Sequence, residues 1–250
     1  MFYNSLKSAT CPLWKRILKA GTNEKIILKE ENSIDVGSSK KKFNDVKSCE
    51  FYKQLISKTY VRASALNTWE EELYYVNFPW DEIYQIPYKC SIETSLQSLQ
   101  YQILNRYLPC NLMLFRWGKR DNLNCNICTT HDDILHYFYH CPQILTFWSQ
   151  FKAWWKMFFY SVVDFGALDV VFGLLNPLND DVINALNYSI LFAKQFIHRN
   201  KFEGNDITLT SFTNCLLNKL KTIHHIAIKQ NKETTFNKQL HPLLNLLDRK

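Results

Sequence analysis

Glycine is scarce in this sequence, with six among 250 residues. Six glycines are too few for a collagen-like repeat or a Gly-rich linker, and no G-x-x-x-x-G-K-[ST] motif is present, which excludes a P-loop. Long apolar runs are missing as well. The richest stretch, FWSQFKAWWKMFFYSVV (147–163), is interrupted by Lys152 and Lys156, whereas a membrane-spanning helix needs about 18 apolar residues.

The opening segment MFYNSLKSATCPLWKRILK also lacks the continuous apolar core of a secretory signal peptide. We therefore expect a soluble intracellular protein that does not associate with membranes. Nucleus and cytoplasm both stay open, because KKK (40–42) is too short a nuclear signal. Disulfides are rare in a reducing compartment, so closely spaced cysteines indicate metal binding instead.

Apolar residues are plentiful, at 46% hydrophobic and 15% aromatic, so the chain can bury a core. Their spacing is helical in several segments, and no strand–helix alternation is visible. The pattern predicts helices near 43–57, 69–75, 80–86, 95–108, 110–118, 142–159 and 208–228, and another that follows an N-cap at Asn179. Pro79 and Pro87 separate the early helices, and ALDVVFGLL (167–175) fits either a strand or a helical turn.

The predicted fold is mainly α, an irregular helical domain built around a small Cys-Cys-His-Cys zinc knuckle. Four parts are expected along the chain. Residues 1–42 form a weakly ordered basic lead-in, and residues 43–118 a helical segment. Residues 119–160 hold the knuckle and a following aromatic helix, and residues 161–250 form a C-terminal helical tail.

The zinc prediction comes from CNICTTHDDILHYFYHC (125–141), which holds three of the eight cysteines and three of the seven histidines. The spacing Cys125-x2-Cys128-x7-His136-x4-Cys141 offers three thiolates and one imidazole, the tetrahedral set that Zn²⁺ prefers. Four protein ligands leave no position for a catalytic water, so the site is expected to be structural. His131 and His140 are rival ligands, and a Cys-Cys-His-His site with His140 is an alternative to the set with Cys141.

Positive charge gathers at the two ends of the chain. The formal net charge is +6 over residues 1–60, −5 over 61–192 and +6 over 193–250. Basic ends suit a polyanion, of which nucleic acid is the commonest, although many soluble proteins are mildly basic without such a partner.

The order of motifs in residues 99–148 resembles that of a known family. The run LQYQILNRYLPCNLMLFRWGKRDNLNCNICTTHDDILHYFYHCPQILTFW (99–148) is similar to the zinc-binding region behind the reverse transcriptase of LINE-type, non-LTR retrotransposons. The matching parts are Pro109, Trp117-Gly118, Cys125/Cys128, Asp132/Asp133, HYFYHCP (136–142) and Phe147-Trp148. The flanks WEEEL (69–73), WDEIYQI (80–86) and 173–202 resemble the linker after the polymerase thumb and the C-terminal tail.

The polymerase itself is missing from this sequence. A reverse transcriptase needs a Tyr/Phe-x-Asp-Asp turn to hold catalytic magnesium, and the Asp-Asp pairs in THDD (130–133) and LNDD (178–181) lack the aromatic residue. No endonuclease-like constellation is present either. We therefore expect a protein that is not an enzyme unless it is joined to a polymerase domain.

The resemblance implies a domain that binds RNA or an RNA–DNA hybrid, and possibly target DNA, in support of target-primed reverse transcription. Other proteins of the element are further possible partners. Exposed aromatic side chains near the zinc could stack unpaired bases, and basic side chains could contact phosphates. The candidate residues for these contacts are Lys119, Arg120, Tyr137, Tyr139, Lys194, Arg199 and Lys201.

Purely structural roles for these residues are alternatives to nucleic-acid binding. Phe138 and one of the tyrosines can pack under the zinc loop, the tryptophans at 148, 154 and 155 suit a core, and the basic residues of the tail can form a solvated helix face. The whole chain can also be a zinc-stabilised adaptor between proteins, or an inactive relic of a reverse transcriptase.

Overall fold

The structure is a computed structural model, and it describes residues 33–36, 39–42, 47–50, 52–53, 61–74, 77–159, 164–176, 178, 180–231, 233–234, 236 and 240–248. The chain divides into two compact units, residues 1–61 and 62–250. The predicted boundaries after residues 118 and 160 fall inside the second unit and stay predictions.

In the first unit, the described residues include a short antiparallel pair of strands, β1 (Ser33–Val36) and β2 (Ser39–Lys42). The pair lies within the segment expected to be a weakly ordered lead-in, most of which lies outside the described residues. Of the helix predicted near 43–57, residues 48–50 and 52–53 are helical and the others are largely not described.

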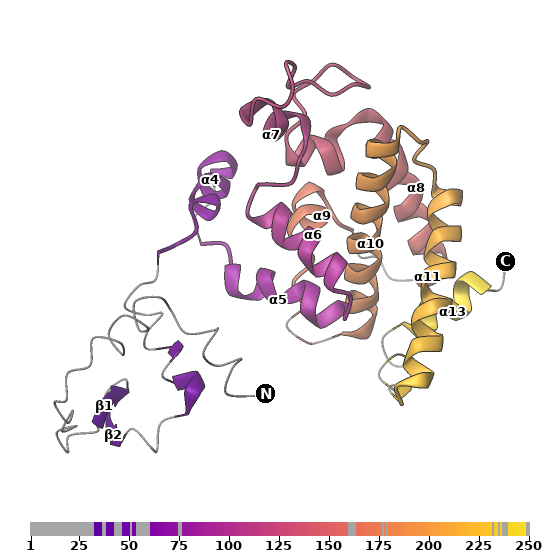
Figure 1. Cartoon of the computed structure of the whole chain (residues 1–250). Helices are drawn as coiled ribbons and strands as arrows, with labels where there is room; N and C mark the ends of the chain where they lie inside the picture. Colours follow the sequence, from indigo (N-terminus) through magenta and orange to yellow (C-terminus); the bar gives the residue numbers. More distant parts are fainter. Residues whose placement is uncertain are drawn as a thin grey trace, which may run out of the picture. The chain divides into compact units, whose positions relative to one another are not determined.

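The second unit is helical, as predicted (Figure 1). Its described elements are α4 (Ser64–Leu73), α5 (Trp80–Cys90), α6 (Thr94–Leu104), α7 (Asn111–Arg116), the π-helix η2 (His136–His140), α8 (Pro142–Phe159), α9 (Ala167–Phe172), α10 (Asp181–Glu203), α11 (Leu209–Lys229) and α13 (His241–Asp248). The segment 167–175, undecided from sequence, therefore begins with a helix.

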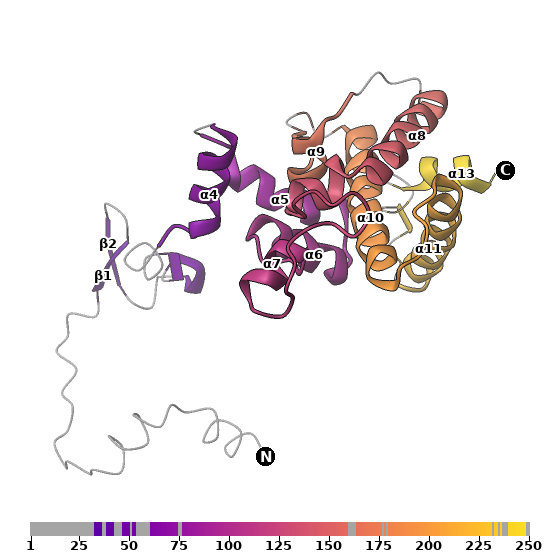
Figure 2. The ribbon, with the colours of Figure 1, turned by 90° about the horizontal axis from the view of Figure 1, so that it is seen from above.

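Helix α10 is the central element of the second unit and packs against α5, α6 and α11 (Figures 1 and 2). Asp180 caps it by accepting the Val182 N–H at 2.7 Å, one position after the predicted N-cap, which lies outside the described residues. All residues from Asn184 to Lys194 are buried, together with Phe196 and Ile197. A helix buried on all sides must have its polar groups matched by neighbouring helices.

Helix α8 supplies the aromatic half of the core. Trp148, Trp154 and Trp155 are buried, which confirms the expectation of a core role for all three. Phe151 stacks on Trp155 with ring centroids 6.1 Å apart, and it also meets Phe212 of α11 at 5.7 Å. Apolar burial of this kind supplies most of the stability of a helical domain.

Pro87 does not separate two helices, and the prediction of a helix end there was wrong. Helix α5 continues through Pro87 to Cys90. A proline inside a helix costs about 3 kcal/mol, because its ring clashes with the preceding turn and one backbone hydrogen bond is lost. Pro87 and Cys90 are both buried in the core, and this packing offsets the local cost.

Candidate metal centre

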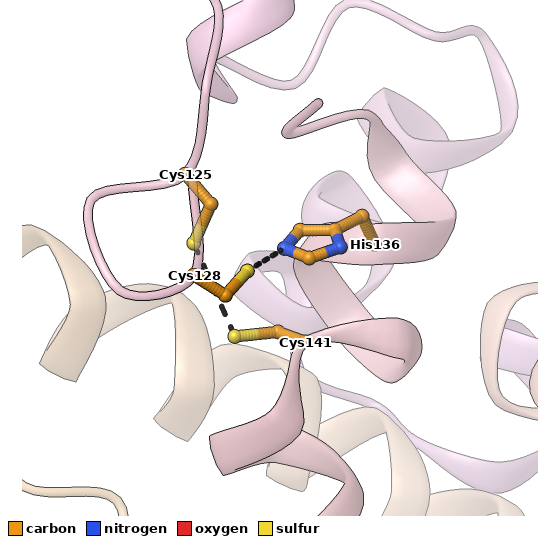
Figure 3. Close-up of side chains that lie close together, drawn as sticks. All are labelled: Cys125, Cys128, His136 and Cys141. Carbon is orange, nitrogen blue, oxygen red and sulfur yellow. Dashed lines mark hydrogen bonds between the residues drawn. The ribbon is translucent and has the colours of Figure 1, made fainter. Parts of the chain in front are cut away.

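Four side chains converge beside η2, as Figure 3 shows: Cys125, Cys128, His136 and Cys141. Their ligand atoms all lie within 4.8 Å of one another. The Cys128 Sγ is 3.2 Å from the His136 Nε2, and the Cys125 Sγ is 4.0 Å from the Cys141 Sγ. These are the four residues that the spacing predicted, and the cluster could hold a metal ion.

The first two ligands come from a closed turn. An antiparallel bridge between Asn124 and His131 joins the two sides of the turn. At its tip the Ile127 N–H lies 3.5 Å from the Cys125 Sγ, so a backbone donor faces the sulfur. The tight C-x2-C turn lets Cys125 and Cys128 reach one ion.

The other two ligands stand at the ends of a single turn of π-helix. The His136 N–H donates to the Asp133 Oδ1 at 2.7 Å, which starts the turn, and the Cys141 N–H donates to the His136 carbonyl at 3.1 Å. Residues five apart on an α-helix point about 140° away from each other. The wider π-turn brings His136 and Cys141 to one side, after which Pro142 begins α8.

The structure selects among the histidines. His131 and His140 are exposed, whereas His136 is buried and its ring reaches the three sulfurs. Among the described residues, the converging set is thus Cys-Cys-His-Cys with Cys141, and neither rival histidine takes part in it.

Burial controls the protonation of the ligands when no ion is bound. It lowers the pKa of His136, which keeps the imidazole neutral and able to bind a metal. Burial raises the pKa of Cys141 to about 11. Burial also opposes ionisation of Cys128, but hydrogen bonds from Thr130 and the neighbouring thiols outweigh it, so the pKa of Cys128 lies below its ordinary value. A metal must therefore displace a proton from Cys141, and its affinity should rise with pH.

The core holds η2 in place from two sides. From α8, the Trp148 Nε1–H donates to the Phe138 carbonyl at 2.7 Å, and Phe138 itself is fully buried. From α10, the Lys201 Nζ donates to the Tyr137 carbonyl at 2.9 Å, and the Tyr137 hydroxyl lies 3.0 Å from the His198 Nδ1. The turn that carries His136 and leads to Cys141 is thus fixed to α8 and to α10.

Helix α7 is tied to the cysteine turn by polar side chains. The Asn111 Nδ2 donates to the Asn124 carbonyl at 2.8 Å, and the Asn111 N–H donates to the Asp132 Oδ2 at 3.3 Å. Arg120 reaches across to both parts, donating to the Asn111 Oδ1 and, at 2.8 Å, to the Asn126 Oδ1. The position of α7 and of the loop after it therefore depends on the turn that carries the first two ligands.

The burial of Lys194 contradicts its predicted contact with phosphate. The residue is 1% exposed, and its Nζ donates to the Gln100 Oε1 and, at 3.3 Å, to the Val171 carbonyl. The sequence led us to expect either a phosphate contact or a solvated helix face, but Lys194 instead faces Gln100 of α6 and Val171 of α9. Burial lowers its pKa to about 7, which further reduces the charge it could offer.

Two further predicted contacts are engaged within the protein. Tyr137 is 6% exposed and cannot stack on a base, which is a second correction. The Lys201 side chain is 9% exposed, and its Nζ lies 4.1 Å from the centre of the Tyr137 ring and 4.0 Å from the Asp132 Oδ1. Both side chains thus help to hold the metal region on α10.

The other four candidates reach the surface to different degrees. Lys119 is exposed, whereas Arg120 and Tyr139 are half-buried. Arg199 is exposed and its Nε lies 3.5 Å from the Glu203 Oε1. These residues keep their predicted role as a proposal.

Sequence reasoning overlooked three residues next to Lys119. Phe115, Arg116 and Trp117, at the end of α7, are exposed, with 42% and 46% of the surface of the two aromatic residues accessible. The signal was present as FRWGKR (115–120), in which aromatic and basic residues are interleaved. Gly118, with a φ of +64°, takes the left-handed backbone conformation just after the end of α7.

Comparison of the chain with known proteins finds no matching family model and no match among the curated proteins. Among the helices that the structure describes, none has the length and apolar character needed to cross a membrane.

Proposed function

We propose that the metal is Zn²⁺ and that it has a structural role. Bonds of about 2.3 Å to sulfur and about 2.0 Å to nitrogen give a tetrahedron with edges of about 3.8 Å between sulfurs and about 3.5 Å between sulfur and nitrogen. The separations of 4.0 Å between Cys125 and Cys141 and 3.2 Å between Cys128 and His136 lie close to those edges. Three thiolates and one imidazole form a closed set that favours zinc over magnesium or calcium.

We further propose that the zinc-bound unit binds single-stranded nucleic acid, and that the loop FRWGKR (115–120) is the contact surface. The observation that carries this proposal is the position of the loop: it exposes Phe115, Arg116, Trp117 and Lys119, and it is tied to the cysteine turn through Arg120. Aromatic rings stack on bases without strong sequence preference, and basic side chains between them neutralise phosphates.

The order of motifs in residues 99–148 supports a more specific form of the proposal. The chain would derive from the zinc region behind a LINE-type reverse transcriptase, and it would bind RNA, an RNA–DNA hybrid or target DNA beside a polymerase. In this role its residues position nucleic acid and perform no phosphoryl transfer.

The test is binding of zinc-loaded protein to fluorescently labelled single-stranded RNA over a series of salt concentrations. We expect affinity to fall steeply as the salt concentration rises. The double variant Arg116→Gln, Lys119→Gln should make the slope of log K against log salt shallower by about 1.4, because each lost phosphate contact removes about 0.7 from its magnitude. Lys89→Gln with Lys156→Gln removes two exposed lysines elsewhere and is the matched control.

Phe115→Ala with Trp117→Ala tests stacking separately, and we expect it to weaken binding at all salt concentrations without a change of slope. Absence of RNA binding at low salt by folded, zinc-containing protein would overturn the nucleic-acid proposal. The exposed aromatic residues of the loop would then favour the alternative role, an adaptor between proteins.

A further inference from the structure

A cavity of about 450 Å³ lies between the cysteine turn and the end of α10. One wall is formed by α7 and Arg120, a second by residues 125–127 of the turn, and a third by residues 200–207. Its volume falls within the range typical of small-molecule sites, about 300–1,000 Å³. Because the candidate ligand Cys125 and the neighbouring η2 residue Tyr137 line it, the cavity depends on the folded cluster.

One lining side chain carries an unused hydrogen-bond acceptor. Asp132 is 3% exposed, and its Oδ1 has no hydrogen-bond partner among the described residues, while its Oδ2 accepts the Asn111 N–H. The nearest cation, the Lys201 Nζ, is 4.0 Å from the Oδ1 and donates instead to the Tyr137 carbonyl. A buried carboxylate oxygen without a donor is costly, so a ligand N–H that reached it would gain a strong hydrogen bond.

The remaining polar lining favours a neutral ligand over a free anion. Two cationic side chains, Arg120 and Lys201, face two carboxylates, Asp132 and Asp206, so the formal charges of the lining cancel. The other polar groups are mostly side-chain amides, Asn126, Gln143 and Asn205 among them. Amides donate and accept hydrogen bonds equally, as the edges of nucleobases do.

An aromatic ring stands at the rim of the cavity. Phe202 is 88% exposed although it lies in the last turn of α10 and lines the cavity. The ring of Tyr137, by contrast, is covered by the Lys201 ammonium group. Phe202 can therefore offer a free face on which a planar ligand could stack.

We infer that this cavity, which we call the base pocket, binds one unpaired nucleobase with an exocyclic amino group, stacked on Phe202 and donating to Asp132. The inference rests on the proposed function, because it assigns to the same nucleic-acid-binding unit a subsite for one base. Entry of the base requires the Lys201 side chain to turn aside and to release the Tyr137 carbonyl, since its Nζ lies 4.0 Å from the Asp132 Oδ1 and that oxygen is covered in this conformation.

The acceptor sets the preference among bases. Cytosine offers its amino group to a carboxylate, and adenine and guanine carry amino groups as well. The ring N–H of uracil stands between two carbonyl oxygens, which a carboxylate repels. We therefore expect cytosine to bind better than uracil, although the two bases are nearly equal in size.

The experiment is titration of the zinc-loaded full chain with CMP and with UMP, followed through the side-chain amide NMR signals of Asn126 and Gln143. The two nucleotides share sugar and phosphate, so any difference reports on the base. We expect CMP to bind roughly ten-fold tighter than UMP. Asp132→Asn should remove that preference, whereas Asp121→Asn, which neutralises an exposed carboxylate nearby, should keep it.

Phe202→Ala is a second variant, chosen because an exposed side chain contributes little to folding. We expect it to weaken both nucleotides roughly ten-fold through lost stacking. Tyr88→Ala, which removes another exposed ring, is its matched control. Equal affinity for CMP and UMP, or full affinity in the Phe202→Ala protein, would overturn the base pocket.

The outcomes separate this inference from the proposed function. RNA binding that depends on residues 115–120, without any preference between CMP and UMP, would leave the proposed function intact and remove the base pocket. Selective CMP binding without RNA binding would support the base pocket and overturn the proposed function, and the protein would then be a receptor for free nucleotides. Oligo(rC) compared with oligo(rU) shows whether the preference also holds within a strand.

Discussion

Segment 121–141 and helix α10 lie side by side in the second unit, and each buries its residues for a different reason. Helix α10 buries a continuous run, from Asn184 to Lys194, among the apolar side chains of its neighbours. Segment 121–141 buries Ile134, Tyr137 and Phe138, but beside them it also buries Asp132, His136 and two of the three candidate ligand cysteines. Apolar contact holds the first region, and directed bonds to four ligand atoms would hold the second.

Because the two regions are held by different interactions, they should respond differently to substitution. Apolar packing is spread over many contacts, so one lost side chain weakens the whole fold by a limited amount. A four-ligand site is nearly all-or-none, because the affinity for the ion depends on every ligand together. Local damage is therefore expected from loss of the ion, and global damage from loss of a core ring.

The largest effect is expected from removing two ligands. Cys125→Ser with Cys128→Ser should abolish stoichiometric zinc, with a local loss on the order of 10 kcal/mol in segment 121–141. Metal content by mass spectrometry and hydrogen exchange along the chain measure the two consequences. Exchange should rise in 121–141 and in α7 but much less in α10. Cys215→Ser with Cys49→Ser, which alters exposed thiols, is the control. Zinc retained in full by the first variant would disprove the site.

A substitution in the apolar core should destabilise the whole second unit and leave zinc binding intact. Phe151 is fully buried between Trp155 and Phe212, and Phe151→Ala should lower the free energy of unfolding by about 3–5 kcal/mol. The folded fraction should still bind one zinc. Urea denaturation and metal analysis give the two quantities, and Met157→Ala, on the exposed side of the same helix, should change neither. Loss of zinc from the folded Phe151→Ala protein would show that the two regions are not separable.

The smallest effect concerns the one lysine inside α10 whose burial is complete. Lys194→Met should raise the free energy of unfolding by about 1–3 kcal/mol at neutral pH, because a buried amine is costly to keep. The pKa of Lys194 is about 7 in the folded protein and about 10.4 in the unfolded chain, so between these values the unfolded chain binds more protons. The stability of the natural protein should therefore rise with pH across this window.

In the Lys194→Met protein the free energy of unfolding should not rise with pH in this way. The difference in stability between the variant and the natural protein should therefore be largest at pH 7 and shrink toward pH 10. Part of the added stability is offset, because the Gln100 Oε1 loses the Lys194 donor. The Gln100 Nε2 still donates to the Val171 carbonyl at 2.8 Å. Thermal unfolding at several pH values measures the effect, with Lys156→Met as the exposed control. Parallel curves for the natural and Lys194→Met proteins would contradict the assignment.

The sequence by itself determined the helical class and the spacing that brings four candidate metal ligands together. Cys125, Cys128, His136 and Cys141 could be found because their spacing along the chain is short, so local turns alone bring them together. The α8, α10 and α11 helices could be found because helical period is also a local property. Both features depend on residues that are close in sequence.

The tertiary structure decided which polar residues are available to a ligand. Lys194 and Lys201 look alike in sequence, yet Lys194 is buried against Gln100 of α6 and Val171 of α9, whereas Lys201 donates to the Tyr137 carbonyl on η2. Helix α5 passes Pro87 because packing outweighs a local penalty. The base pocket joins Asp132 to Phe202, seventy residues away in sequence. Burial and partners of this kind depend on which distant segments meet, and local spacing does not contain that information.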